Sequence, residues 1–251
     1  MHKIYISPAN HYKKYEIQGY TEKEQMDKLA PLLIKVLERY EDVEVILTSV
    51  YDPDRSYTGR PEEAANLGCD IYVALHTNAG GGKGACVFYH PSFEKSEKLA
   101  VAVVNSLNAI CPIKSNRAVQ PAVYPWSKVL WNFGELREPA SLGICPILIE
   151  HEFHDTTAGA HWIINNLGAI AKADAEGIAD ALGLKRKLGD GDVNGDGFTD
   201  SLDAAKILKY DAGIDVLTEE QKNAADANGD GEVDGLDAAF ILKADTQQNN
   251  R

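Results

Sequence analysis

The sequence predicts an α/β protein with a mixed, largely parallel sheet flanked by helices, followed by a small α-helical module. Short apolar runs typical of buried strands alternate with helical patterns through residues 1–184, an arrangement that favours parallel strands. Residues 190–246 contain an internal repeat instead. We therefore expect a sheet domain at 1–184, a linker at 185–189, the helical module at 190–246 and a tail at 247–251.

The expected elements of the first domain follow from these patterns in order. Strands are expected at 3–7, 43–48, 71–75, 85–89 and 147–149. Helices are expected at 22–40, 61–67, 92–110 and 156–184. Pro31 lies inside the first helical pattern, so we expect a kink or a break near Ala30. Residues 112–145, which include four prolines, are expected to be rich in loops.

The formal net charge of −13 is unevenly distributed. From Asp190 onward there are 15 acidic and 5 basic side chains, a balance of −10, which leaves −3 for the first 189 residues. This acidity argues against nucleic-acid partners and indicates a cation site in the C-terminal part. The chain lacks the apolar run of about 18 residues that a transmembrane helix needs. No signal peptide precedes the first strand, so we expect either that one has been removed or that export does not use that route.

The four cysteines are expected to be small core residues rather than partners in disulfides. All of them lie in or beside apolar stretches, and the chain has no Cys-x-x-Cys pair. They are Cys69, Cys86, Cys111 and Cys145.

Three of the expected strands lead into a histidine or a carboxylate. His11 follows the first strand, His76 closes the strand at 71–75, and Glu150 closes the strand at 147–149. The C-terminal ends of strands are the usual place for functional groups in open α/β sheets. One histidine in such a place is more often a packing residue. Two histidines, a carboxylate and an open position make the usual catalytic zinc site, and a second carboxylate can then act as base, so the pattern predicts a hydrolase.

The carboxylate ligand is expected at the start of the helix at 22–40. Thr21 and Glu24 have the spacing of a capping box, with Thr21 as the N-cap residue, and this would engage the Glu24 side chain. Glu22 in the first turn is then free to face a cation. We therefore favour Glu22 as the ligand, with Glu24 as the alternative.

Residues 3–183 resemble the zinc-dependent N-acetylmuramoyl-L-alanine amidases of the amidase-3 type. The resemblance is carried by Leu-His-Thr-Asn-Ala at 75–79 and by Pro-Ile-Leu-Ile-Glu-His-Glu-Phe-His-Asp at 146–155. The usual Gly-His-Gly of that family is replaced here by Asn10-His11-Tyr12.

This resemblance implies one Zn²⁺ bound by His11, Glu22 and His76, with Glu150 as the catalytic base. The reaction it implies is hydrolysis of the amide bond between N-acetylmuramic acid and L-alanine in peptidoglycan. One alternative is a related zinc amidohydrolase or peptidase that acts on another amide within an extracellular enzyme complex. A non-catalytic module that binds the cell wall is a third hypothesis.

The remaining histidines have other expected places. His151 should point away from the side that Glu150 faces, because neighbouring residues at a strand end alternate in direction. His154 could reach the cleft as a substrate contact. His90 and His161 are expected at the surface.

The C-terminal repeat has the pattern of two calcium loops. Each copy has oxygen side chains at loop positions 1, 3, 5, 9 and 12, glycine at 6, a backbone carbonyl ligand expected at 7, and Asp in place of the usual Glu at 12. The expected ligands of the first Ca²⁺ are Asp192, Asn194, Asp196, Phe198, Asp200 and Asp203. Those of the second Ca²⁺ are Asp226, Asn228, Asp230, Glu232, Asp234 and Asp237.

Each loop is followed by an expected helix, at 202–210 and at 236–243, but residues 185–191 are too short and Gly-rich for the leading helix of an EF-hand. In this respect residues 190–246 resemble a type I dockerin. The resemblance implies a cohesin domain of a scaffold protein as partner, two structural Ca²⁺ ions, and an extracellular or cell-surface location of the cellulosome kind. Loop positions 10 and 11, which steer partner choice in that family, are Ser201, Leu202, Gly235 and Leu236.

Overall fold

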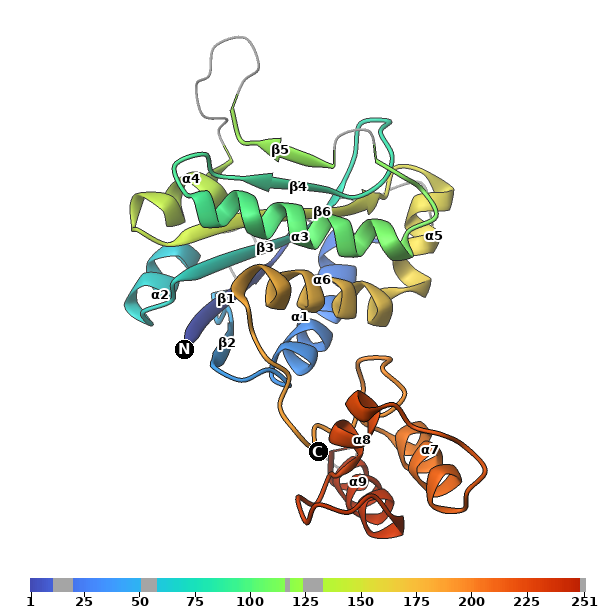
Figure 1. The fold of residues 1–251 in the computed structure, drawn as a ribbon. Coiled ribbons are helices and arrows are strands. Elements are labelled where there is room, and N and C mark those ends of the chain that lie inside the picture. The colour runs from blue at the N-terminus through green and yellow to red at the C-terminus, as the bar shows by residue number, and fades with distance from the viewer. Residues whose placement is uncertain (11–19, 51–57, 116–117, 124–132, 249–251) are drawn as a thin grey trace. The chain divides into compact units, whose positions relative to one another are not determined.

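The chain forms two compact units in its computed structural model (Figure 1). One unit comprises Met1–Glu38 and Asp42–Leu184, and the other comprises Arg39–Glu41 and Lys185–Arg251. The structure describes residues 1–10, 20–50, 58–115, 118–123 and 133–248. Among the helices of these residues, none has the length and apolar character needed to cross a membrane.

The first unit is built on a six-stranded sheet. Its strands are β1 (His2–Pro8), β2 (Val43–Leu47), β3 (Ile71–Asn78), β4 (Cys86–Tyr89), β5 (Val119–Pro121) and β6 (Cys145–Phe153). They lie in the order β2-β1-β3-β6-β4-β5. All neighbouring pairs are parallel except β4 and β6, which are antiparallel. The predicted mixed, largely parallel sheet is therefore confirmed.

Helices cover both faces of this sheet. They are α1 (Glu22–Leu37), α2 (Arg60–Asn66), α3 (Glu94–Ile110), α4 (Gly134–Ser141), α5 (Thr157–Asn165) and α6 (Leu167–Leu182). In Figure 1, α1, α3 and α6 lie together over one face, and their apolar residues share one core cluster with the sheet. Residues of α2 and α4 share the second cluster, on the opposite face.

The central strand β3 is apolar from Ile71 to Leu75 because both of its faces are covered. Ile71, Val73 and Leu75 belong to the core cluster on the α1 side. Tyr72 and Ala74 belong to the cluster on the α2 and α4 side. Successive side chains of a strand point to opposite faces, so a sheet covered on both faces has nearly continuous apolar strands.

Helix α1 begins as predicted, because the Thr21 hydroxyl accepts the backbone N–H of Glu24 at 3.1 Å. The expected second half of the capping box is wrong, because the Glu24 carboxylate pairs with Lys28 at the surface, at 2.7 Å, and not with the Thr21 backbone. The helix continues through Pro31, so the sequence near Ala30 does not break it.

Other elements differ from the predictions in extent. Helix α4 and strand β5 lie in the segment expected to be rich in loops. Strand β6 extends beyond the short apolar run on which it was predicted, so it includes Glu150. The helical cover at 156–184 is divided into α5 and α6 at Asn166.

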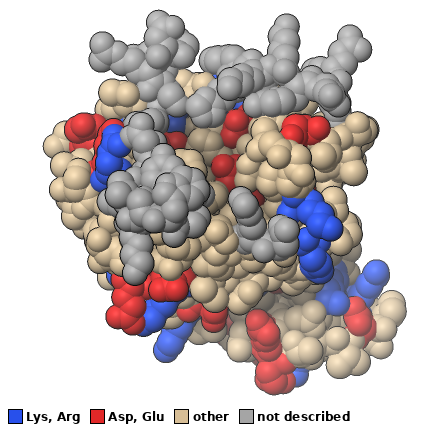
Figure 2. All heavy atoms as spheres, turned by 90° about the horizontal axis from the view of Figure 1, so that it is seen from above, with Lys and Arg blue, Asp and Glu red and all other residues tan. Residues whose placement is uncertain are grey.

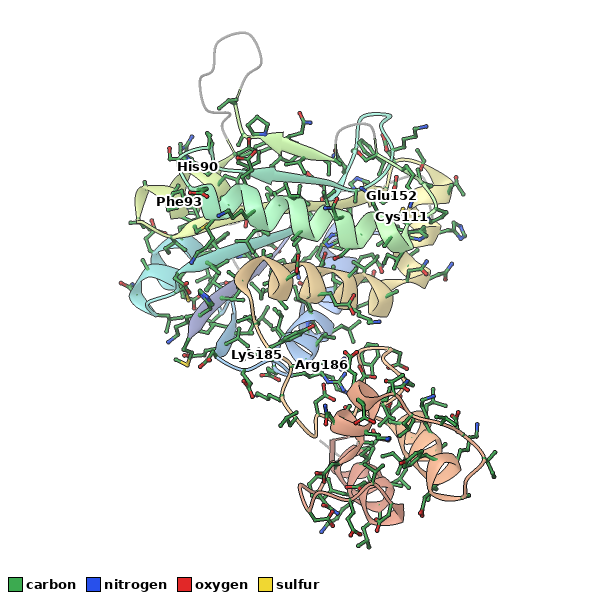
Figure 3. All side chains as sticks on the ribbon, viewed as in Figure 1. His90, Phe93, Cys111, Glu152, Lys185 and Arg186 are labelled. Carbon is green, nitrogen blue, oxygen red and sulfur yellow. The ribbon has the colours of Figure 1, made fainter. Side chains whose placement is uncertain are left out.

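The expectation that His90 lies at the surface is wrong. Its side chain is buried, and its ring contacts the ring of Phe93 edge-on at a centroid distance of 5.8 Å (Figure 3). The backbone N–H of His90 donates to the Ser96 hydroxyl, which fixes the residue at the start of α3. His161 is exposed, as expected.

The second unit contains three helices among its described residues. They are α7 (Ser201–Asp211), α8 (Glu219–Ala225) and α9 (Gly235–Gln248). Helix α8 was not predicted from the sequence. A small apolar core joins the three helices to the loops, formed by Val193, Ala204, Ile207, Leu217, Ala225, Ala238 and Ile241. Arg39–Glu41 belongs to this unit, and Glu41 donates its backbone N–H to the carbonyl of Lys185 at 2.8 Å.

All four cysteines are free and buried, as predicted for small core residues. Burial raises the pKa of Cys69 to about 11 and that of Cys145 to about 12.

Because the thiolate is the reactive form, we predict that the native chain does not react with a disulfide reagent within minutes at pH 8. The chain unfolded in urea without reductant should release four thiols. A rapid reaction of the native chain, or fewer than four thiols after unfolding, would contradict this.

Candidate active site

His76 lies near the C-terminal end of β3, beside Glu150 of β6. The two residues are partners in the register of these parallel strands. Residues in register in neighbouring strands lie on the same face of the sheet. The sheet thus brings together two of the predicted site residues.

Glu22 joins them from the first turn of α1. Its carboxylate is buried, and its Oε1 lies 3.1 Å from Nδ1 of His76. The same oxygen accepts the backbone N–H of Thr77 at 3.0 Å. Glu24, the alternative ligand, is exposed on the helix and pairs with Lys28. Of the two carboxylates, the structure places Glu22 next to the histidine.

A second carboxylate, which the sequence analysis missed, contacts the other side of the His76 ring. Glu135 in the first turn of α4 is buried, and its Oε2 lies 2.7 Å from Nε2 of His76. Its Oε1 accepts hydrogen bonds from the Ser7 hydroxyl at 2.5 Å and the Tyr72 hydroxyl at 3.1 Å. The only sequence signal was an acidic residue placed between Phe133 and Leu136.

These contacts shift the pKa values of both partners. Burial by itself lowers the pKa of His76, but the hydrogen bonds to Glu135 and Glu22 outweigh it and raise that pKa well above its usual value. Burial likewise works to raise the pKa of Glu135, but the hydrogen bond to His76 lowers it. The Glu135 carboxylate is therefore a strong hydrogen-bond acceptor for an N–H group of the His76 ring.

Glu150 has the opposite electrostatic character. Burial raises its pKa to about 7, the charge of His76 opposes this shift, and the carboxylate of Glu22 adds to it. Its Oε2 is buried and has no hydrogen-bond partner among the described residues. Glu150 is thus a carboxyl group that can hold or release a proton near neutral pH.

Glu150 lines a cavity of about 510 Å³. The other lining residues come from the end of β3, the loop after it, β4, the loop after α3, the segment before α4 and the end of β6. They are Asn78, Ala79, Gly80, Gly81, Gly82, Lys83, Cys86, Phe88, Ser115, Phe133 and Phe153. Asp and Glu side chains are visible in the central hollow of the face shown in Figure 2.

The glycine loop of this cavity is fixed by two features. The Asp155 carboxylate accepts the backbone N–H groups of Gly80 at 2.7 Å and Gly81 at 2.9 Å. A Cβ atom at Gly82 would lie 2.1 Å from the Phe153 ring, so only glycine allows the loop to approach that ring. The loop is therefore a defined wall of the cavity.

His151 and His154 do not line this cavity among the described residues. His151 is fully buried, with Nδ1 2.8 Å from the His76 carbonyl oxygen and Nε2 2.8 Å from Asp174 of α6. His154 is also buried, with Nδ1 2.7 Å from the Thr77 hydroxyl. Both side chains thus contact the end of β3.

Among the described residues, no group of three or more His, Cys, Asp or Glu side chains converges on one point as metal ligands do. His11, the expected third ligand, lies outside the described residues. The 3.1 Å between Nδ1 of His76 and Oε1 of Glu22 suits two ligands of one zinc ion, because tetrahedral bonds of about 2.0–2.1 Å place neighbouring ligands about 3.3 Å apart. These two residues fit the predicted metal.

The two acidic loops of the second unit have matching geometry. Asp203 accepts the backbone N–H groups of Asn194 and Asp200, and Asp237 accepts those of Asn228 and Asp234. The glycines at loop position 6, residues 197 and 231, have φ angles of 95° and 89°, which other residues rarely adopt.

The first residues of the two loops differ in their partners. Asp192 is paired with Arg186 at 2.6 Å. In contrast, Oδ1 of Asp226 is buried with no hydrogen-bond partner in the described part of the chain. An oxygen of this kind suits a bound cation. At loop position 11, Leu202 and Leu236 are both exposed.

Both parts of the chain match known families. Residues 9–180 match the family described as N-acetylmuramoyl-L-alanine amidase, and residues 190–244 match the dockerin type I domain. The sporulation-specific N-acetylmuramoyl-L-alanine amidase of Bacillus subtilis (strain 168) is 26% identical over 196 residues, which cover 76% of this chain and 72% of that protein.

Solved structures share the fold of the first unit. The catalytic domain of CwlV, an N-acetylmuramoyl-L-alanine amidase from Bacillus (Paenibacillus) polymyxa var. colistinus, aligns with a TM-score of 0.60 at 18% identity, covering 74% of this chain and 100% of that chain. An N-acetylmuramoyl-L-alanine amidase from Clostridium difficile 630 aligns with a TM-score of 0.57 at 24% identity, covering 72% and 94%.

Proposed function

We propose that this chain is a zinc-dependent amidase attached to a scaffold, because it belongs to the N-acetylmuramoyl-L-alanine amidase family and has a type I dockerin domain after its amidase domain. The bond it cleaves joins N-acetylmuramic acid to L-alanine in peptidoglycan. The observation that supports this most directly is Glu150, a half-buried residue that lines the cavity and lies in register with His76.

His11, Glu22 and His76 would hold the zinc ion in this proposal. The fit of Glu22 and His76 supports two of the three ligands, with their nearest atoms 3.1 Å apart. When bound, zinc supplies a Lewis acid that polarises the amide carbonyl and lowers the pKa of water.

Glu150 is the base of the proposed reaction. Its carboxylate takes a proton from the water molecule that adds to the amide carbon. As the carbon–nitrogen bond breaks, Glu150 returns this proton to the leaving amine of L-alanine. One group can do both because burial raises its pKa to about 7, close to the pH at which the enzyme would work.

Residues 190–246 would bind two Ca²⁺ ions and a cohesin domain, which would place the enzyme outside the cell or at its surface. The matching loops and the buried, unpartnered Oδ1 of Asp226 support the calcium sites. Leu202 and Leu236 are exposed at the starts of α7 and α9 and are available to a partner. The domain boundaries that we propose are 1–184 for the amidase and 190–246 for the dockerin.

Two variants distinguish the proposed base from a metal ligand. Glu150→Ala should retain about one zinc ion per chain and lose a factor of about 10²–10⁴ in the rate of peptidoglycan cleavage, because only proton transfer is removed. Glu22→Ala should lose zinc and activity together. Metal analysis of the purified variants and the release of L-Ala amino groups without new reducing ends measure these effects.

Glu24→Ala is the matched control in the same turn of α1. It removes only an exposed pair with Lys28, worth about 0.3–0.5 kcal/mol, so zinc content and activity should not change. Loss of zinc in Glu24→Ala but not in Glu22→Ala would reverse the ligand assignment. Substantial activity in Glu150→Ala would show that Glu150 is not the base.

The activity is expected to depend on pH. A base must be deprotonated, so kcat/KM should fall as the pH is lowered through the pKa of Glu150, which burial raises. A carboxylate with an ordinary pKa of about 4.3 would keep the enzyme active to much lower pH. We expect a clear loss between pH 8 and pH 5, measured on soluble peptidoglycan fragments. An unchanged kcat/KM over this range would contradict the role of Glu150.

The fold of the second unit is expected to depend on calcium. Each loop holds four or five carboxylates whose repulsion a bound cation relieves, and the core of this small unit is limited. A calcium chelator should therefore unfold residues 190–246 of the full chain and expose them to trypsin, while a fragment of the amidase domain survives. Circular dichroism should show the partial loss of helix. An unchanged spectrum and cleavage pattern would contradict the calcium-dependent fold.

A further inference from the structure

Glu135 is the buried carboxylate at the site that the proposed reaction does not use. Its two oxygens have separate partners. Oε2 lies 2.7 Å from Nε2 of His76, and Oε1 accepts hydrogen bonds from the hydroxyl groups of Ser7 and Tyr72. Both oxygens thus have defined acceptor roles in the protein interior.

The surroundings of Glu135 favour its charged form. Arg60, whose side chain is among the most deeply buried of the described residues, donates to the Ser7 hydroxyl at 2.9 Å and to the Pro8 carbonyl at 2.6 Å. Ser7 in turn donates to Glu135. The guanidinium therefore polarises the hydroxyl that binds the carboxylate, which strengthens that hydrogen bond.

The His76 ring has two different neighbours at its two nitrogens. Nδ1 lies 3.1 Å from Glu22, whereas Nε2 lies 2.7 Å from Glu135. A histidine binds a metal through one nitrogen, and the hydrogen bond made by the other nitrogen decides which one that is. Carboxylates commonly accept this second N–H bond, which fixes the ring and makes the ligating nitrogen more basic.

We propose that Glu135 is the positioning residue of His76, accepting its Nε2–H so that the Nδ1 lone pair faces Glu22 and the metal. This inference rests on the proposed zinc function. It makes Glu135 part of the metal site without direct contact with the metal. The hydroxyl groups of Ser7 and Tyr72 hold the carboxylate in place for this task.

The geometry disfavours Glu135 as a further ligand. Glu22 and Glu135 contact different nitrogens, which point away from each other across the ring. In agreement with this, the described residues contain no group of three or more His, Cys, Asp or Glu side chains arranged as the ligands of one metal ion. The same network also reaches the end of β1 through Ser7 and Pro8, which precede His11 closely in the chain.

The test measures zinc affinity in the full chain by competition with a chelator. Glu135→Ala should still take up one zinc ion at saturation, with a dissociation constant raised about 10–100-fold. Glu135→Gln keeps a neutral acceptor of the same shape and should show a smaller increase. Glu24→Ala is the control, because its exposed carboxylate pairs with Lys28 and takes no part in the network around His76. It should leave the zinc affinity unchanged.

A second readout is the protonation state of His76 in the zinc-loaded protein. Nitrogen-15 NMR shifts should show Nε2 protonated and Nδ1 bound to metal. Metal at Nε2, with zinc lost in Glu135→Ala and kept in Glu22→Ala, would make Glu135 a ligand and overturn the inference. Unchanged zinc affinity in both Glu135 variants would overturn it as well. If the wild-type chain binds no zinc, the proposed function fails first, and this result differs from a failure of Glu135 alone.

Discussion

The candidate site depends on one buried imidazole that lies between two carboxylates. His76 stands at the end of β3, Glu22 comes from α1 and Glu135 comes from α4. A buried charge is costly unless it is paired and hydrogen-bonded, so the ring and its neighbours are stable only when all three elements meet. The apolar clusters on the two faces of the sheet hold α1 and α4 in place, and the packing thus sets the chemistry.

The parts of this arrangement that could be predicted from the sequence are those with a local signal. The apolar run at 71–75 and the cap at Thr21 indicate where β3 and α1 begin, and Glu22 lies in the first turn of α1 as predicted. Strand β3 continues to Asn78, so His76 lies within it and not directly after it. Glu135 has no such signal. It lies in a short helix with an internal proline, within a segment rich in loops. Its role follows only from long-range contacts with β1 and β3, which neither spacing nor periodicity reveals.

The dockerin unit illustrates the opposite case, because its loops are specified almost entirely by local sequence. Glycine at position 6 permits the positive φ, and the last Asp of each loop accepts backbone N–H groups from within the same loop. Helix α8 was missed because it lies between the repeats and has only seven residues. In both units, local chemistry defines the ends of elements, while the tertiary packing decides which side chains meet.

The central claim is that His11, Glu22 and His76 together hold a catalytic zinc ion. X-ray absorption at the zinc edge of the fully loaded chain tests it directly. The account predicts four nitrogen or oxygen ligands at about 2.0–2.1 Å, with the scattering pattern of two imidazole rings. A sulfur ligand at about 2.3 Å, or the pattern of a single imidazole ring, would contradict it.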